Sequence, residues 1–156
     1  MTQTPSPDFR VARSGDLLRL VELLRDDPLG AGRESGYGDA KAQYEKAFRA
    51  IDTDPHNMII VAEIDGEICG CLQLTYIPGL TYQGGERAQI EGVRVATGRR
   101  GGGLGRMMLD HAIDLAAKRG CVLVQLTSDR SRGRALAFYR SAGFDDSHCG
   151  MKLRLR

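Results

Sequence analysis

VRVATGRRGGGLGR, residues 93 to 106, is the stretch of sequence that decides the fold. Its first three residues end a strand pattern, and Leu104 begins a run of apolar residues at helical spacing that should end at Gly120. Glycines between the two let successive backbone N–H groups point at one place, at the positive end of the helix dipole. Arg100 and Arg106 add full charges there. The stretch predicts a phosphate or pyrophosphate site.

The spacing of the glycines excludes two common phosphate-binding motifs. A Walker loop requires Lys directly after its last glycine, whereas Arg106 follows Gly105 here. A dinucleotide fingerprint starting at Gly101 requires Gly or Ala at position 106, and one starting at Gly103 requires it at Met108. What remains is a strand, a glycine turn and a helix, without the code for a nucleoside triphosphate or a dinucleotide.

Upstream of this stretch, Glu86 to Val95 is a strand pattern with a change of phase. Ile90 puts apolar character on even positions, whereas Val93 and Val95 put it on odd ones, and Gly92 stands at the switch. A strand keeps both sets on one face only with an extra residue, so we expect a β-bulge near Gly92. A bulge splays neighbouring strands and is common beside active sites.

The first half of the chain predicts antiparallel pairing. The two strand patterns 58–64 and 67–76 are joined by Asp65-Gly66, a strong hairpin signal. Before them we expect a strand at 9–12, a helix from Leu17, a mobile loop at 26–38 and a helix over 40–51.

The second half predicts crossover units on a partly parallel sheet. Cys121 to Leu126 is a continuous apolar run, typical of a strand covered on both faces. A helix ending at Gly143 follows, and His148 to Leu155 predicts a last strand. We therefore expect an α/β fold in one domain, residues 1–156, with a frayed end at about residues 1–8. It should have a mixed central sheet of six or seven strands and about four helices.

Composition narrows the function class. With 156 residues, 42% of them hydrophobic, and a net charge of +2, the chain is typical of a globular protein and not of a cationic nucleic-acid clamp. It has no apolar run long enough to span a bilayer and no export signal, so we expect a cytoplasmic protein without nucleic-acid or membrane partners. The four cysteines contain no C-x-x-C pair. Although Cys69 and Cys71 would share one strand face, we expect free thiols and no metal.

At this point the chain resembles the GNAT superfamily of acyl-CoA-dependent N-acetyltransferases. The family pattern Arg/Gln-x-x-Gly-x-Gly/Ala at a strand-to-helix turn is met by Arg100, Gly103 and Gly105. A second family motif, an aromatic-Tyr pair followed shortly by Gly-Phe, is met by Phe138-Tyr139 and Gly143-Phe144. The order of elements and the length also agree. The resemblance implies the GNAT-like fold, with splayed strands where acetyl-CoA binds.

The resemblance also implies acetyl-CoA as co-substrate and assigns residues to it. The coenzyme A pyrophosphate would lie on 101–106, and the backbones of Val93 and Val95 would pair with the pantetheine arm. Arg132 stands where the family often has Asn and could supply counter-charge to the phosphates. The full set for the cofactor is Val93, Val95, Arg100, Gly101, Gly102, Gly103, Leu104, Gly105, Arg106 and Arg132.

The implied reaction is direct transfer of an acetyl group to a primary amine of a small molecule or a peptide. Tyr139 would donate a proton to the departing sulfur, and Glu91, beside the expected bulge, would act as base directly or through water, with Glu86 in reserve. The acceptor would lie between 28–37 and 76–86, which offer tyrosines and carboxylates. A non-catalytic coenzyme A-binding regulatory module is the alternative, and a homodimer is left open.

Overall fold

The computed structural model describes residues 6–155 of the chain. Its strands are β1 (Asp8–Val11), β2 (Asn57–Ile64), β3 (Glu67–Ile77), β4 (Arg87–Val95) and β5 (Leu123–Leu126). Its α-helices are α1 (Leu17–Arg25), α2 (Pro28–Arg33), α3 (Lys41–Asp52), α4 (Thr81–Gly84), α5 (Leu104–Arg119) and α6 (Gly133–Ser141), and its 3₁₀ turns are η1 (Ser14–Asp16) and η2 (Thr97–Arg99).

The strands form one mixed sheet in the order β1-β2-β3-β4-β5. Neighbours from β1 to β4 are antiparallel, and β4 and β5 are parallel, connected through α5. The predicted hairpin is confirmed, because Asp65 and Gly66 both adopt positive φ, 53° and 79°, between β2 and β3. Thus the chain has the expected α/β architecture.

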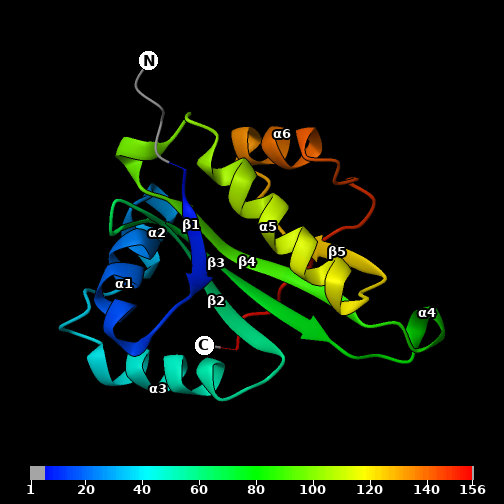
Figure 1. Cartoon of the computed structure of the whole chain (residues 1–156), viewed down its shortest axis with the longest axis horizontal. Coiled ribbons are helices and arrows are strands. Elements are labelled where there is room, and N and C mark those ends of the chain that lie inside the picture. The colour runs from blue at the N-terminus through cyan, green and yellow to red at the C-terminus, as the bar shows by residue number, and fades with distance from the viewer. Residues whose placement is uncertain (1–5, 156) are drawn as a thin grey trace.

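Helices cover both faces of the sheet (Figure 1). On one face α5 packs its buried side chains against inward residues of β2, β3 and β4, including Leu72, Leu74 and Ile90. On the other face α1 and α3 pack against residues such as Val61 and Cys71. The sheet is therefore the middle layer, and the glycine stretch runs from its edge onto the α5 side.

The predicted bulge is confirmed at Gly92. Cys71 pairs with Arg94 and Gln73 pairs with Glu91, so three steps along β4 face two steps along β3. Gly92 adopts a φ of 61°, which an L side chain rarely tolerates. Beyond the bulge β4 also leaves β5, because their pairing ends at Ile90, opposite Leu126. Residues 91–95 of β4 are therefore splayed from β5 within the described residues.

Several expectations about element number are wrong. The described chain has five strands and six α-helices, not six or seven strands and about four helices. The expected strand at 148–155 is absent, and its residues are exposed and form no ladder. The predicted loop at 26–38 contains α2, where Asp27 caps the helix by accepting the Gly30 N–H at 2.6 Å. A capping carboxylate starts this short helix despite its glycines.

Three finer expectations also differ from the structure. Cys69 and Cys71 do not share a face, because an irregularity in the β2–β3 pairing sends them to opposite cores. β5 is half-exposed along its length and not covered on both faces. Of the expected frayed end, residues 1–5 lie outside the described residues, whereas Asp8 pairs with Glu63 in the sheet.

Candidate active site

The glycine turn presents backbone donors to solvent. Gly101 and Gly103 adopt φ of 80° and 84°, and Gly103 is the N-cap of α5. A Cβ at either position would meet nothing within 4 Å, so the backbone and not packing requires glycine here. The first helical hydrogen bond runs from the Met107 N–H to the Gly103 carbonyl at 3.1 Å. The N–H groups before it in the first turn have no intrahelical acceptor, as at the N-terminus of any helix.

Gly105 has a different role from the other glycines of the turn. A Cβ there would lie 3.6 Å from both the Phe138 ring and the Val95 side chain. The absence of a side chain lets the first turn of α5 approach α6 and β4 closely. The two parts of the chain that carry the family motifs therefore pack against one another.

The two arginines predicted for phosphate binding are turned away from the turn. The Arg100 guanidinium donates to the Val95 carbonyl at 2.9 Å and to the Asp26 carbonyl, and so braces the turn against the end of α1. Arg106 is paired with Asp110 at 2.9 Å and donates to the Ser141 carbonyl at 3.2 Å. In this structure the positive potential at the turn comes from the helix end itself.

The resemblance requires free strand backbone at Val93 and Val95, but both carbonyls accept a hydrogen bond from an arginine here, Val93 from Arg94 and Val95 from Arg100, each at 2.9 Å. The Ala96 N–H donates to the Cys69 carbonyl at 2.8 Å, so Ala96 and Arg94 turn their backbone groups toward β3. Strand alternation then turns the backbone groups of Val93 and Val95 toward the side from which β5 has departed. An extended ligand arm that added there as a further strand would take the place of the arginine donors at these two carbonyls.

A buried charge cluster that the sequence reasoning missed lies next to this gap. Asp27 and Arg94 have side chains only 9% and 8% exposed, with Oδ2 and Nε 3.1 Å apart. These two atoms nevertheless lack a hydrogen bond within the described chain. Arg132, the N-cap of α6, brings a second guanidinium to 3.6 Å from the same oxygen. The cluster joins α2, β4 and α6 and carries one more positive than negative charge.

Tyr139 lies beside this cluster. Its ring packs between Phe138, with centroids 5.2 Å apart, and Phe144, with centroids 6.1 Å apart. Burial raises the pKa of the Tyr139 phenol above its ordinary value, and the nearby charges of Arg132 and Arg94 partly oppose that rise. The phenol therefore keeps its proton at neutral pH and is available as a donor.

The two candidate bases have different surroundings. Glu91 is exposed on β4 directly before the bulge and pairs across the ladder with Gln73. Glu86 instead holds Arg119 in a bidentate ion pair, at 2.6 and 3.0 Å. That hydrogen bonding lowers the pKa of Glu86, which makes it a poorer base. The geometry favours Glu91 over Glu86.

The segments expected to line one acceptor pocket are far apart. Figure 1 places α2 and α4 at opposite ends of the sheet. Tyr76 is buried, and Glu86 is engaged by Arg119, while Tyr37 and Glu34 contact residues of α3. The expectation of one shared pocket rested on segments that flank strands in the sequence. It was wrong because β3 and β4 are long enough to keep these segments apart.

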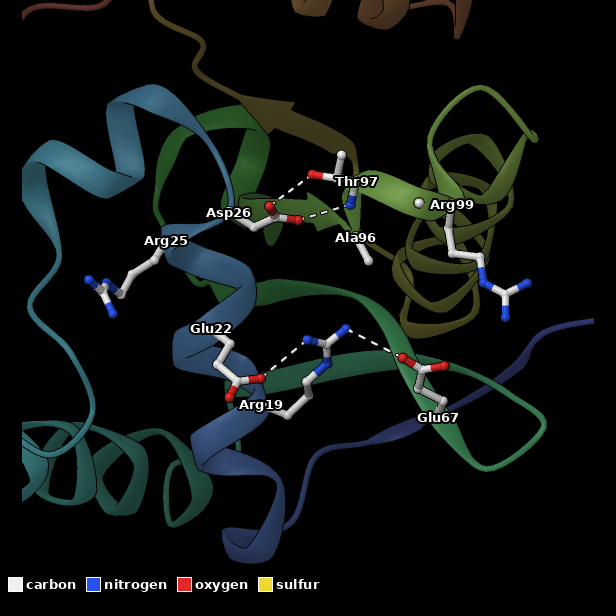
Figure 2. Close-up of a pocket in the computed structure, with 9 residues that line it drawn as sticks. Arg19, Glu22, Arg25, Asp26, Glu67, Ala96, Thr97 and Arg99 are labelled. Atoms are coloured by element: carbon white, nitrogen blue, oxygen red, sulfur yellow. Dashed lines mark hydrogen bonds and ion pairs between the residues drawn. The ribbon is translucent and has the colours of Figure 1, made fainter.

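A cleft lies beside the exit of β4, away from Tyr139. It has a volume of about 520 Å³ and lies between α1, the start of β3 and residues 96–99. Figure 2 shows Asp26 hydrogen-bonded to Thr97 at its upper edge and Arg19 between Glu22 and Glu67 at its lower edge. Its polar groups largely pair with one another, so we assign the chemistry to the gap at β4 and not to this cleft.

Other features of the described residues concern metals, membranes and His111. Within residues 6–155 no group of three or more His, Cys, Asp or Glu side chains is arranged to hold a metal ion. Nor does any helix in that range have the length and apolar character needed to cross a bilayer. His111 is half-buried and stacks on Phe9 with ring centroids 4.7 Å apart, and its partial burial lowers its pKa.

Comparison with known proteins agrees with this geometry. A profile of the Acetyltransferase (GNAT) family matches residues 17–144. Streptothricin acetyltransferase from Streptomyces lavendulae is 31% identical over 149 residues, which are 95% of this chain and 72% of that protein. Glucosamine 6-phosphate N-acetyltransferase from Trypanosoma brucei brucei is 32% identical over 159 residues, 99% of this chain and 100% of that protein.

A solved structure extends the likeness over the whole fold. A transcriptional regulator from Bacillus halodurans C-125 superimposes with a TM-score of 0.92 and 45% identity, covering 96% of this chain and 99% of that one. The matched family range contains the bulge, the glycine turn and Tyr139. The resemblance expected from the motifs is confirmed: the chain belongs to the acetyltransferase (GNAT) family.

Proposed function

We propose that this chain, acting as one domain, transfers an acetyl group from acetyl-CoA to a primary amine of a small molecule or a peptide by direct attack. The observation that carries the proposal is the strand-to-helix turn, where two positive-φ glycines expose backbone donors beside the strand that leaves β5. A pyrophosphate would lie on the N–H groups of 101–106, and the pantetheine arm would pair with Val93 and Val95. The free cysteines support a cytoplasmic setting.

The proposed chemistry forms one bond and breaks one. The neutral amine attacks the thioester carbonyl, its nitrogen bonds to the acetyl carbon, and the carbon–sulfur bond breaks. Glu91 takes the amine proton, directly or through water, because an amine with a pKa near 10.4 is mostly charged at neutral pH. Tyr139 gives its proton to the departing sulfur, and the raised pKa of its buried phenol keeps that proton in place until then. The nitrogen loses its second proton as the amide forms, and this proton restores the Tyr139 phenol.

The relatives support a small polar acceptor. Two proteins about a third identical to this chain are named for streptothricin and for glucosamine 6-phosphate. The excess positive charge of the cluster formed by Asp27, Arg94 and Arg132 is compatible with an acceptor that also carries an anionic group. A peptide amine remains within the proposal.

A non-catalytic coenzyme A-binding module is the second candidate. It is favoured by the Bacillus halodurans structure, which is 45% identical and is described as a transcriptional regulator. Arg132 also favours it, because it stands where the family often has Asn. This change alters the expected coenzyme site, and the transfer reaction does not require it. Tyr139 favours the enzyme, since a binding module has no need of a proton donor at the sulfur.

One assay separates the two candidates. Acetyl-CoA is offered with a panel of amines, including streptothricin, glucosamine 6-phosphate, a free lysine and a lysine-containing peptide, and free thiol release is followed. If the chain is an acetyltransferase, thiol release should depend on the amine, and the product should be heavier than the amine by one acetyl group. Tight coenzyme A binding by calorimetry, with no thiol release for any amine, would favour the regulatory module.

A further inference from the structure

A row of uncharged polar side chains crosses the sheet on the face that does not pack against α5. The strand register places its four members opposite one another across β2, β3, β4 and β5: Asn57, Thr75, Gln89 and Gln125. We call these four residues the polar row. Residues of the opposite parity, such as Leu74, are buried against α5, whereas the members of the polar row are only half-buried.

Hydrogen bonds among these side chains hold the polar row in place. The Thr75 hydroxyl donates to the Asn57 side-chain oxygen at 2.6 Å, and the Gln125 amide donates to the Gln89 side-chain oxygen at 2.6 Å. Gln73, two residues before Thr75 in β3, donates to the same Asn57 oxygen at 3.2 Å. Each amide has two N–H donors and an oxygen with two lone pairs, so these bonds use only part of its capacity. The polar row is therefore positioned and can still donate and accept.

Composition separates the polar row from an ordinary solvated sheet face. The helices on this face, α1 and α3, pack against Val61 and Cys71, and Figure 1 shows both helices toward the end of the sheet away from α4. A sheet face that meets only water usually carries charged side chains, and none of the four members of the polar row is charged. Hydroxyl groups both donate and accept, as amides do, so a neutral row of this kind matches a ligand with several hydroxyl groups.

The polar row leads to the proposed active site through Glu91. Glu91 follows Gln89 by two residues in β4, before the bulge, so both side chains leave the sheet on the same face. The bulge at Gly92 begins directly after Glu91. Two residues of a strand span about 6.5 Å, which is comparable to the length of a six-membered ring with its hydroxyl groups. An amine whose nitrogen lies at Glu91 therefore has the rest of its molecule over Gln89 and Gln125.

We propose that the polar row binds the body of the acceptor, and that the acceptor is an amine with several hydroxyl groups, such as an amino sugar. This inference rests on the proposed acetyl transfer and gives its acceptor a chemical class. Gln89 and Gln125 are the specificity-determining residues, because they exchange hydrogen bonds with the hydroxyl groups while Glu91 takes the amine proton. An amine with an apolar body covers the same amides and leaves them unpaired, which costs binding free energy.

The first test compares glucosamine with cyclohexylamine, a primary amine on a six-membered ring without hydroxyl groups. The kcat/KM for thiol release, expressed per neutral amine, should be at least ~10-fold higher for glucosamine. Gln89→Leu and Gln125→Leu should each lower that ratio about 3-fold or more. Gln43→Leu removes an exposed amide on α3 and should leave the ratio within about twofold. A ratio near one in the original chain, or one that neither row variant lowers, would overturn the proposal.

The second test detects binding without turnover. With coenzyme A bound, glucosamine should shift the side-chain amide NMR signals of Gln89 and Gln125, cyclohexylamine should not, and the Gln43 signals should stay in place with both. These shifts without thiol release from any amine would support the polar row as a site for hydroxylated ligands and refute the proposed transfer. Thiol release from glucosamine without these shifts would place the acceptor elsewhere and overturn the inference alone. Neither shifts nor thiol release would overturn both.

Discussion

Helix α5 begins and ends at a glycine of nearly the same backbone conformation, yet its two ends differ in what surrounds them. Gly103 and Gly120 have φ of 84° and 88°, and neither has a neighbour where a Cβ would lie. At Gly120 the chain satisfies the helix end with its own hydrogen bonds, because the N–H groups of Gly120 and Cys121 donate to carbonyls of the last turn at 3.0 Å. At Gly103 the first-turn donors stay open.

The charged groups around the two ends follow the same division. Near Gly120, Arg119 is held by both oxygens of Glu86 and stacks 4.0 Å above the Tyr76 ring. Near Gly103, the buried Asp27 and Arg94 face one another without a hydrogen bond between their nearest atoms. The comparison teaches that the chain itself can satisfy the backbone groups at one end of a helix and leave those at the other end unpaired.

The largest effect on turnover should come from Tyr139, on the Gly103 side of α5, and not from Tyr76, on the Gly120 side. Tyr139→Phe removes the phenolic proton and keeps the ring, so turnover with saturating acetyl-CoA should fall about 10²- to 10⁴-fold, while the affinity for acetyl-CoA changes little. Tyr76→Phe removes a phenol at the closed end and should leave turnover within about twofold of the original. Steady-state thiol release measures both, and equal rates for the two variants would return Tyr139 to a purely packing role.

The charge clusters of the two ends should differ in stability. Asp27→Asn keeps an N-cap for α2 but leaves Arg94 buried without its counter-charge, which should lower the unfolding free energy by about 3 kcal/mol. Glu86→Gln breaks an exposed pair and should cost far less. Urea denaturation at neutral pH measures both, and a loss no greater for Asp27→Asn than for Glu86→Gln would show that the buried pair adds nothing.

The Asp27 cluster also has a pH signature. Burial alone would raise the pKa of the Asp27 carboxyl. That pKa nevertheless lies below its ordinary value of 3.8, because the Gly30 N–H and the Arg94 and Arg132 charges outweigh the effect of burial. A lowered pKa means that the stabilisation is fully present above about pH 4 and is lost as pH falls through the lowered pKa. The unfolding free energy of Asp27→Asn should lack this acidic component.

Valine at the two glycines separates strain from ligand binding. Gly103→Val and Gly120→Val both force an L side chain into the left-handed region, which should cost at least about 1–2 kcal/mol each. Coenzyme A at 100 times its Kd should stabilise the original chain and Gly120→Val by about 2.7 kcal/mol. Gly103→Val should lose that stabilisation. A full coenzyme A-induced rise in Tm in Gly103→Val would disprove the phosphate site.

The smallest effect, about tenfold at neutral pH, is expected at Glu91. Glu91→Gln removes the base, so the reaction should depend on amine that is already neutral in solution, a fraction that rises about tenfold per pH unit below the amine pKa. Activity should be lost near neutral pH and partly recovered in alkali. Glu86→Gln should show the original profile. The reverse result would place the base at the closed end of the strand.

Sequence reasoning worked where the signal is local. Asp65-Gly66 fixes a hairpin through its own backbone preferences, and the change of apolar parity at Gly92 can be resolved only by an extra residue in the strand. The glycine turn was expected for the same reason, because Gly101 and Gly103 require a positive φ within one segment. These features depend on a few consecutive residues.

Sequence reasoning failed where the partner of a residue lies far along the chain, and where a strand pattern found no partner strand among the described residues. The pairing of Asp27 with Arg94 leaves no periodic trace, although an arginine between two valines in a strand was a signal that a counter-charge was needed. The strand expected at 148–155 has the right alternation but no partner among the described residues. Periodicity predicts that a segment is suited to a sheet, not which sheet it joins.

The hydrogen bonds between Asp26 and the segment that enters the glycine turn affect the order in which the chain folds. Asp26 accepts hydrogen bonds from the backbone N–H and the hydroxyl of Thr97, 71 positions later in the chain, and its carbonyl accepts from Arg100, 74 positions later. During synthesis the end of α1 therefore stays without these partners until β4 has emerged and its exit turn has formed. Contacts of such separation are slow to close and come after the local hairpin. The glycine turn should therefore form late in folding, and if it binds coenzyme A as proposed, coenzyme A present during refolding should speed the recovery of the final steps.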